Sequence, residues 1–337
     1  MVIASECFRS NLVGEPSTRT AQVVLPADYD SSSDRYPVVV LLHGFGRNSA
    51  RSGLWFGEGY AADLDLTAVL ASAVGLGRAR PMILVCPDGG TWLGGGMWHD
   101  SPISGMAATF VADELVREVD RQFRTVALPA YRGIAGHSMG GQGALQIVMN
   151  HPKVFASAYS LNAMMSFNES QLLRYSDAWR LALSEGQRSE DWSEMACAYL
   201  AMCMAFCWTG RQPMCGVKFP IVDSPRGPRV EPAVAERFLS QWPSQTFQTS
   251  NAAATLRGLL GLGLEVALDD EFDWGVESNR RFIRQLQAAG VPYQYTEAAG
   301  SHTSGIAERL ENRVLPFFST CFAKAGAVRD DLIESRA

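Results

Sequence analysis

The chain has 337 residues, of which 47% are hydrophobic and 19% are charged. This composition is typical of a folded globular protein and excludes an intrinsically disordered one. The formal net charge of −6 comes without a long basic block. We therefore expect neither nucleic acid nor an anionic membrane as a partner. The length fits one large α/β domain with an insertion, or two average domains.

Short apolar runs at intervals along the chain predict strands. The clearest is 37–42, a β-branched run without polar alternation, as expected for a strand that is covered on both faces. Further strands are expected at 20–26, 82–86, 132–136, 155–161, 262–268 and 292–297.

Helical patterns lie between these strands, at 107–123, 139–150 and 277–289. The last helix is expected to end at Gly290, because Pro292 follows shortly after. Alternation of strands and helices predicts an α/β protein with a mostly parallel central sheet and helices on both faces.

One stretch, from about Met164 to Gly261, shows no clear strand. We expect residues 1–162 and 262–337 to form one catalytic domain, and 163–261 to be an inserted, mainly helical cap. Caps of this kind commonly shape substrate pockets, and structural padding is the less favoured alternative.

The N-terminal residues Met1 to Cys7 lack a basic region followed by an apolar run, so we expect no signal peptide and a cytoplasmic location. The longest apolar stretch, 195–208, is about half a membrane span and is interpreted as a buried helix. Four of the seven cysteines crowd this region: Cys197, Cys203, Cys207 and Cys215. Their spacing fits no metal site. We expect buried thiols, with a disulfide within this group as the alternative.

A nucleophile motif of the form G-x-S-x-G occurs at 136–140, with Ser138 at its centre. A predicted strand ends at Gly136 and a predicted helix begins at Met139, which is the strand–turn–helix context that this motif requires. The glycines suit a strained turn in which a side chain would collide with neighbouring backbone. Ser138 is therefore the candidate nucleophile.

A serine nucleophile needs a base, and the chain has five histidines. His43 ends a strand, His99 lies in a loop, His137 adjoins the serine and His151 precedes a proline. His302 follows the last predicted strand, where the chain order serine, acid, histidine places the base. We therefore expect His302 to be the base.

The acid that orients this histidine should follow the preceding strand, where residues 269–273 offer four carboxylates. Asp270 is the preferred candidate, with Asp269 and Asp273 as alternatives. The loop His43–Gly44–Phe45–Gly46 follows the 37–42 strand. The backbone N–H groups of Phe45 and Met139 are the expected oxyanion hole.

Several segments in this order resemble the esterase family that includes S-formylglutathione hydrolase, feruloyl and acetylxylan esterases, enterochelin esterases and mycolyltransferases. The resembling motifs are Tyr36–Pro37 before Leu42–His43–Gly44, Pro87–Asp88–Gly89, Gly136–Gly141, Leu268–Phe272 with Asn279–Phe282, and Gly300–His302. The resemblance covers about 15–162 and 262–320. It implies the α/β-hydrolase fold and an esterase activity, and it places the acid on Asp270. Ala267 and Ser301 depart from the usual glycines without removing a catalytic group.

The resemblance also implies that the segment 92–100 lines the substrate pocket. The candidate substrate-binding residues are Trp92, Trp98, Asp100, His43 and Gly44. For Trp98, binding of an acyl group and simple packing stay open. A helix with Met195, Met202 and Met204 suggests an adaptable apolar surface near the site, which favours acyl or aryl groups.

We therefore expect a carboxylic-ester hydrolase that acts on short acyl or aryl esters through an acyl-enzyme on Ser138. The alternatives are a thioesterase or an acyltransferase with the same triad, and a non-catalytic binding protein on this fold. No phosphate-binding loop or metal-ligand cluster is present in the sequence, so we expect no cofactor and no metal. The expected partner is a small-molecule ester, and the oligomeric state stays open.

Overall fold

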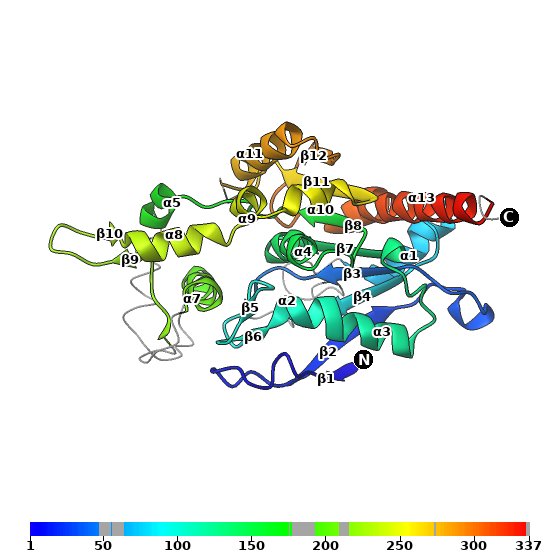
Figure 1. Cartoon of the computed structure of the whole chain (residues 1–337), viewed down its shortest axis with the longest axis horizontal. Coiled ribbons are helices and arrows are strands. Elements are labelled where there is room, and N and C mark those ends of the chain that lie inside the picture. Colours follow the sequence, from blue (N-terminus) through cyan, green and yellow to red (C-terminus); the bar gives the residue numbers. More distant parts are fainter. Residues whose placement is uncertain are drawn as a thin grey trace.

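The computed structural model describes residues 1–46, 55, 64–174, 176, 193–208, 216–272 and 274–334. Within them, one large sheet has the strand order β1-β2-β4-β3-β7-β8-β11-β12 (Figure 1). Its strands are β1 Val2–Ala4, β2 Thr18–Val24, β3 Val38–Leu42, β4 Ile83–Pro87, β7 Arg132–His137, β8 Ser157–Leu161, β11 Gly261–Ala267 and β12 Gln294–Ala298. The pairs β1–β2 and β2–β4 are antiparallel, and the strands from β4 to β12 run parallel.

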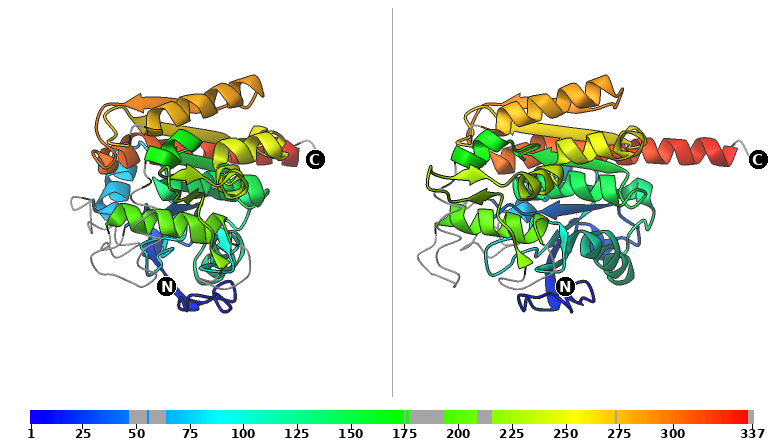
Figure 2. Two further views of the ribbon diagram at one scale, coloured as in Figure 1. Left: turned by 90° about the vertical axis from the view of Figure 1, so that its left-hand side faces the viewer. Right: turned by 60° about the vertical axis from the view of Figure 1, so that its left-hand side comes forward.

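Helices surround this sheet. They are α1 Leu66–Gly75, α2 Ala107–Thr109, α3 Val116–Gln122, α4 Met139–Asn150, α5 Glu169–Arg174, α7 Glu194–Phe206, α8 Pro232–Ser240, α9 Pro243–Thr249, α10 Ala252–Arg257, α11 Trp274–Ala288, α12 Ile306–Arg309 and α13 Leu315–Glu334. The described residues also form two short hairpins, β5 Asp100–Ser101 with β6 Gly105–Met106 and β9 Ile221–Val222 with β10 Arg229–Val230. In the right-hand view of Figure 2, the red helix α13 extends beyond the body of the molecule toward the C-terminus.

Two hydrophobic cores cover the two faces of the sheet, and the strand residues alternate between them. In β3, Val38, Val40 and Leu42 belong to the core beneath α4 and α11, whereas Val39 and Leu41 belong to the core beneath α1 and α13. Side chains of a strand point alternately to opposite faces, so a strand covered on both faces must be apolar throughout. This is why residues 37–42 show no polar alternation in the sequence.

The α/β class with a mostly parallel sheet, predicted from the sequence, is confirmed. Each of the seven predicted strands corresponds to a strand of the large sheet, with ends that differ by at most two residues. The edge strand β1 was not predicted, because three residues are too short to show a period of two.

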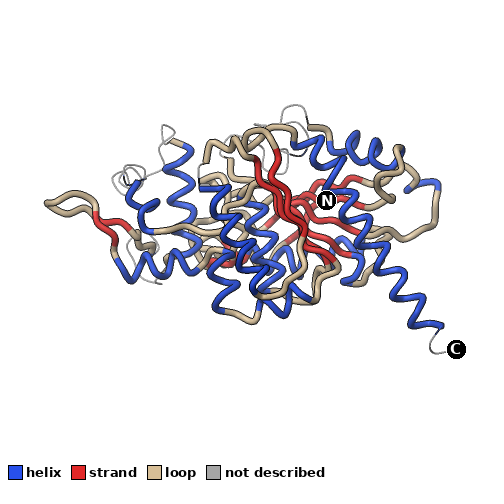
Figure 3. The backbone as a smooth tube through the Cα atoms, turned by 90° about the horizontal axis from the view of Figure 1, so that it is seen from above, coloured by secondary structure: helices blue, strands red, loops and turns tan. Residues whose placement is uncertain are grey.

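The predicted insertion contains helices in the part that the structure describes. α5, α7, α8 and the β9–β10 hairpin lie together beyond one end of the sheet (Figures 1 and 3). α9 and α10, which precede β11 in the chain, instead pack on α4. The sequence showed no clear strand here, and in the described part of this segment the structure adds this hairpin of two-residue strands.

None of the helices in the described ranges combines the length and the apolar character that crossing a membrane would require. The predicted cytoplasmic location is not tested by this finding.

Candidate active site

Ser138 lies in a sharp turn between β7 and α4. Its backbone has φ 55° and ψ −118°, a strained combination for a residue other than glycine. The turn is held because the Ser138 amide donates to the Leu161 carbonyl at 2.8 Å and the Ser138 carbonyl accepts from the Gln142 amide at 3.1 Å. The side chain thus projects at the carboxyl end of the sheet, next to the N-terminus of α4.

The glycines on either side of Ser138 allow β7, α4 and β3 to approach one another closely. A Cβ atom on Gly140 would lie 2.0 Å from the Leu42 carbonyl oxygen, and one on Gly136 would lie 2.2 Å from the Gly140 carbonyl carbon. Both contacts are with backbone atoms, which cannot move aside. The sequence motif is therefore a steric requirement of this turn.

His302 and Asp270 form a hydrogen-bonded pair. His302 Nδ1 lies 2.7 Å from Asp270 Oδ2, and the two side chains are 10% and 1% exposed. The other carboxylate oxygen of Asp270 accepts from the Phe272 amide at 2.9 Å. Because an ionised carboxylate can only accept, Nδ1 of His302 carries the hydrogen of this bond and Nε2 is left as the basic nitrogen.

Backbone hydrogen bonds beyond the ends of β11 and β12 join the loop that carries Asp270 to the loop that carries His302. The Leu268 amide donates to the Ala298 carbonyl at 2.8 Å, and the Asp269 amide donates to the Gly300 carbonyl at 3.0 Å. The Asp269 carboxylate accepts from the Gly300 amide at 3.1 Å. Asp269, an alternative acid in the sequence analysis, thus binds the loop instead of the imidazole.

The other carboxylates of this segment have different positions. Glu271 accepts from the His302 amide at 3.1 Å, and backbone N–H groups of Glu271 and His302 hold the pKa of its carboxyl below the usual range. Asp273, the remaining alternative acid, lies outside the described residues.

His137, which the sequence analysis set aside as a base, is fully buried behind the pair. Its Nε2 lies 2.8 Å from the His302 carbonyl oxygen, and the two rings are 4.8 Å apart. Burial, with a smaller contribution from His302, lowers the pKa of His137 to about 3. His137 is therefore neutral near pH 7 and donates through Nε2 to this carbonyl.

One cavity of about 330 Å³ brings the predicted residues together. Ser138, Asp270 and His302 line it, as do Phe45 and Met139, whose backbone N–H groups are the predicted oxyanion hole. Four strand ends deliver these residues, because Phe45 follows β3, Ser138 follows β7, Asp270 follows β11 and His302 follows β12. The carboxyl end of a parallel sheet is the usual location of such sites.

Sulfur-containing and aromatic side chains form much of the rest of this cavity. Five methionines line it: Met97, Met139, Met164, Met195 and Met202. Three of the lining residues, Met195, Ala198 and Met202, share one face of α7. Met204 of the same helix is instead buried in the core.

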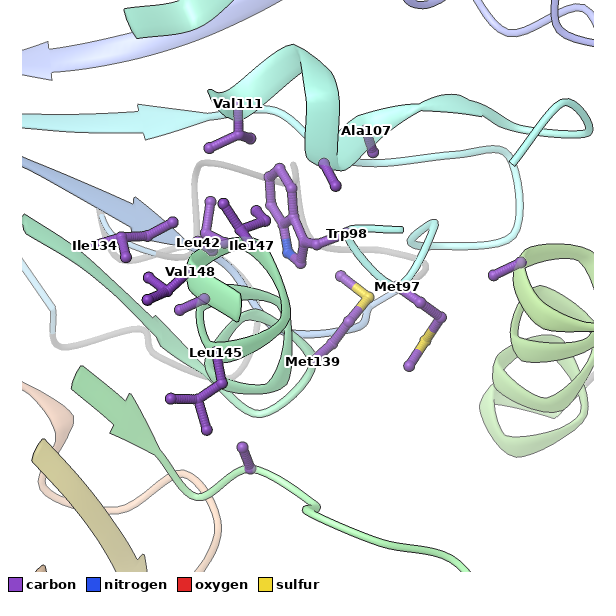
Figure 4. Packing of buried hydrophobic residues seen from close by; sticks show 14 of the residues in the cluster. Leu42, Met97, Trp98, Ala107, Val111, Ile134, Met139, Leu145, Ile147 and Val148 are labelled. Carbon is purple, nitrogen blue, oxygen red and sulfur yellow. The ribbon is translucent and has the colours of Figure 1, made fainter. Parts of the chain in front are cut away.

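Trp98, a predicted substrate-binding residue, does not line this cavity. It is 1% exposed and its indole Nε1 donates to the His43 carbonyl at 3.0 Å. Its ring is packed among Leu42, Val111 and Ile147 (Figure 4). A Cβ atom on Gly143 would come within 2.5 Å of the Trp98 side chain. Of the two interpretations left open by the sequence, the structure favours packing, and it does so because the indole fills the space that this glycine leaves free.

The other predicted substrate-binding residues, Trp92, Asp100, His43 and Gly44, are also absent from the lining of the cavity. The Trp92 amide donates to the Glu15 carboxylate at 2.9 Å, and Asp100 accepts from the amide and hydroxyl of Thr109 at the start of the α2–α3 helical segment. His43 is 1% exposed. Its Nε2 accepts from the Gly89 amide at 3.0 Å and its Nδ1 donates to the Gly44 carbonyl at 2.8 Å. These hydrogen bonds give Trp92, Asp100 and His43 structural contacts away from the cavity lining.

Several cavity residues were not singled out by the sequence analysis, among them Gln142, Asn162, Phe272 and Trp242. Gln142 lies one helical turn after Ser138, so the spacing i to i+4 could have placed it on the same face of α4. Phe272 packs edge-on against His302, with ring centroids 4.9 Å apart. Asn162 and Trp242 come from distant parts of the chain and carry no local signal.

The structure describes three of the four crowded cysteines. Cys197 and Cys203 lie in α7 and Cys207 directly follows it, whereas Cys215 lies outside the described residues. All three are buried, as predicted, and Cys203 and Cys207 are free thiols. A disulfide that involves Cys215 stays untested. In the described part of the chain, no cluster of three or more His, Cys, Asp or Glu residues is placed to hold a metal ion.

This geometry is that of an α/β-hydrolase-fold protein with a serine elbow and a buried acid–histidine pair. Comparison with known families agrees: residues 15–305 match the Esterase family, described as "Putative esterase". The chain therefore belongs to this esterase family, and the predicted family resemblance is confirmed.

Curated relatives match part of the chain. Esterase Rv1288 of Mycobacterium tuberculosis is 35% identical over 143 residues, which are 41% of this chain and 27% of that protein. An endo-1,4-beta-xylanase/feruloyl esterase of Xylanibacter ruminicola is 30% identical over 149 residues, which are 41% of this chain and 18% of that protein. The matches thus span about a quarter or less of these relatives' length.

Solved structures match almost the whole chain. A ferulic acid esterase superposes with a TM-score of 0.63 at 21% identity, covering 95% of this chain and 96% of that one. An S-formylglutathione hydrolase of Agrobacterium tumefaciens superposes with a TM-score of 0.56 at 16% identity, covering 96% and 94%. At these identities the likeness concerns the fold, and it confirms the predicted α/β-hydrolase fold.

Proposed function

We propose that the protein is a serine hydrolase of carboxylic esters, with Ser138 as nucleophile, His302 as general base and Asp270 as the acid that orients it. The observation that carries this proposal is the 2.7 Å bond between His302 Nδ1 and Asp270 Oδ2 in a cavity that the strained Ser138 turn also lines. Membership in the esterase family supports the same reaction class.

In the first step, Ser138 Oγ attacks the ester carbonyl carbon and its proton passes to His302 Nε2. The Asp270 carboxylate holds the Nδ1–H tautomer and stabilises the imidazolium that forms. His302 then gives the proton to the departing alcohol, which leaves an acyl group on Ser138. Water, deprotonated by His302, attacks this acyl-enzyme and releases the carboxylic acid.

Negative charge develops on the former carbonyl oxygen in both steps. The backbone N–H groups of Phe45 and Met139 are the proposed donors to this oxygen. Met139 is the first residue of α4, so its N–H is not used within the helix and the helix dipole adds favourable potential. The His43 hydrogen bonds to Gly44 and Gly89 hold the loop that carries Phe45.

The cavity supports short acyl or aryl esters as substrates. Its volume of about 330 Å³ is at the small end of ligand pockets, and its methionine and aromatic walls favour apolar groups. The inserted segment 163–261 supplies Met164, Met195, Ala198, Met202 and Trp242 to these walls. We propose that this segment is a cap that sets the choice of acyl group.

The direct test is the initial rate on p-nitrophenyl esters from acetate to palmitate, for the wild type and Ser138→Ala. We expect a maximum at short chains that is lost in the folded variant. Turnover of thioesters but not of oxygen esters would contradict the proposal and would identify the protein as a thioesterase. Absence of turnover on both, by a folded wild type, would contradict it.

A further inference from the structure

Asn162 follows β8, is 2% exposed and joins three separate segments of the chain. Its side-chain Nδ2 donates to the His302 carbonyl at 2.5 Å. Its Oδ1 accepts from the Ala267 amide at 2.8 Å and from Arg309 Nη1 at 3.1 Å. One amide side chain therefore connects the end of β11, which leads to Asp270, with the loop that carries His302.

The chemistry of this position calls for asparagine. The backbone of Asn162 has φ 48°, a left-handed conformation that asparagine adopts more readily than most residues, and its amide donates to the Glu265 carbonyl at 2.8 Å. An asparagine side chain offers both a donor and an acceptor, whereas an aspartate of the same size offers acceptors only. The His302 carbonyl needs the donor, and Ala267 and Arg309 need the acceptor.

A buried charge network fixes Arg309 behind Asn162. Arg309 is 2% exposed, and its Nε lies 3.3 Å from Oε1 of the fully buried Glu265. Glu265 is also bonded by Arg313 at 2.9 Å through both carboxylate oxygens and by the Tyr159 hydroxyl at 3.0 Å. Arg313 holds Glu265 through both carboxylate oxygens, and this buried carboxylate in turn holds Arg309 beside Asn162.

We propose that Asn162 is a positioning residue for the Asp270–His302 pair. It acts on the backbone of His302, together with the His137 donor at 2.8 Å, and fixes the imidazole relative to the carboxylate. Small displacements of a catalytic group reduce the rate strongly, so loss of this bond affects turnover more than binding. The inference rests on the proposed role of the Asp270–His302 pair.

Asn162→Asp is the variant that isolates the donated bond, because it keeps the size and the acceptor contacts. We expect kcat on p-nitrophenyl acetate to fall about tenfold or more with little change in KM. We also expect the acidic limb of the pH–rate profile to move to higher pH, because a nearby carboxylate favours the imidazolium. Tyr159→Phe is the matched control: it removes a bond to Glu265 in the same network without contacting His302. We expect it to lower Tm and to keep kcat.

A folded Asn162→Asp with wild-type kcat and pH profile overturns the inference. If this variant does not fold, Asn162→Gly takes its place, since glycine suits the positive φ, and wild-type kcat there overturns the inference equally. The downfield proton resonance of His302 Nδ1 gives a readout that does not need turnover. We expect it to shift or broaden in the variant, and an unchanged resonance contradicts the inference. If the wild type shows no turnover but the His302 Nδ1 resonance still shifts in the variant, the proposed function is refuted and the positioning role of Asn162 is kept.

Discussion

At the scale of single residues, two adjacent aspartates have different environments. Asp270 points at the imidazole of His302 and is 1% exposed, whereas the Asp269 carboxylate accepts from the Gly300 amide on the loop after β12. Neighbouring residues after a strand end point in different directions, so only one of the two can meet the histidine. Their sequence positions alone could not separate them.

Asp270→Asn tests this assignment. The amide keeps the shape but can present its NH₂ group to Nδ1, which favours the wrong imidazole tautomer. We expect kcat to fall by about 10³- to 10⁴-fold. Asp269→Asn, the matched control, should keep most of the activity in the same ester assay. The reverse ranking of the two variants would assign the acid to Asp269.

At the scale of secondary structure elements, the nucleophile turn depends on close packing of β3, β7 and α4. Gly140→Ala places a Cβ atom 2.0 Å from the Leu42 carbonyl oxygen. We expect the free energy of unfolding to fall by about 3 kcal/mol, measured by urea denaturation. Gly75→Ala, at the end of α1, meets no atom within 4 Å and should leave stability unchanged or slightly higher. Equal stability of the two variants would contradict the steric account.

The face of α7 that lines the cavity gives a second prediction at this scale. Met202→Ala removes side-chain volume from the cavity wall, so the preferred p-nitrophenyl ester should shift to a longer acyl chain. Met204→Ala, on the buried face of the same helix, should cost about 2–5 kcal/mol of stability and leave the chain-length profile unchanged. An unchanged profile for Met202→Ala would exclude α7 from the acyl site.

At the scale of the whole molecule, burial of neutral histidine makes stability depend on pH. The pKa of His137 is about 3 in the folded protein, against an ordinary value of 6.5, and burial also lowers the pKa of His99. Between about pH 3 and pH 6.5, the unfolded chain binds a proton at His137 that the folded protein excludes. The free energy of unfolding therefore falls as the pH falls below about 6.5.

From pH 7 to pH 5, the loss at His137 should be about 2 kcal/mol in the free energy of unfolding, measured by urea denaturation. His137→Gln keeps a donor for the His302 carbonyl but does not titrate, so this variant should lose correspondingly less. An identical pH dependence in the two proteins would show that His137 does not contribute.

The sequence predicted the sheet well because its strands are buried on both faces, and runs such as 37–42 are then apolar throughout. It also predicted Ser138, Asp270 and His302, whose positions follow from strand ends and chain order, and the structure gathers them at one cavity. It left open whether Trp98 packs or binds substrate, and it did not predict that Asn162 and Trp242 reach the cavity. These placements depend on contacts between segments far apart in the chain, which leave no local pattern.

Covalent labelling of Ser138 tests the central claim most directly. The protein would be treated with a fluorophosphonate probe at pH 7.5, and the adduct would be located by intact-mass measurement and peptide mapping. We predict one adduct per chain on Ser138, absent in Ser138→Ala and formed much more slowly in Asp270→Asn. Labelling at another residue, or no labelling of the folded wild type, would contradict the assignment of Ser138 as the nucleophile.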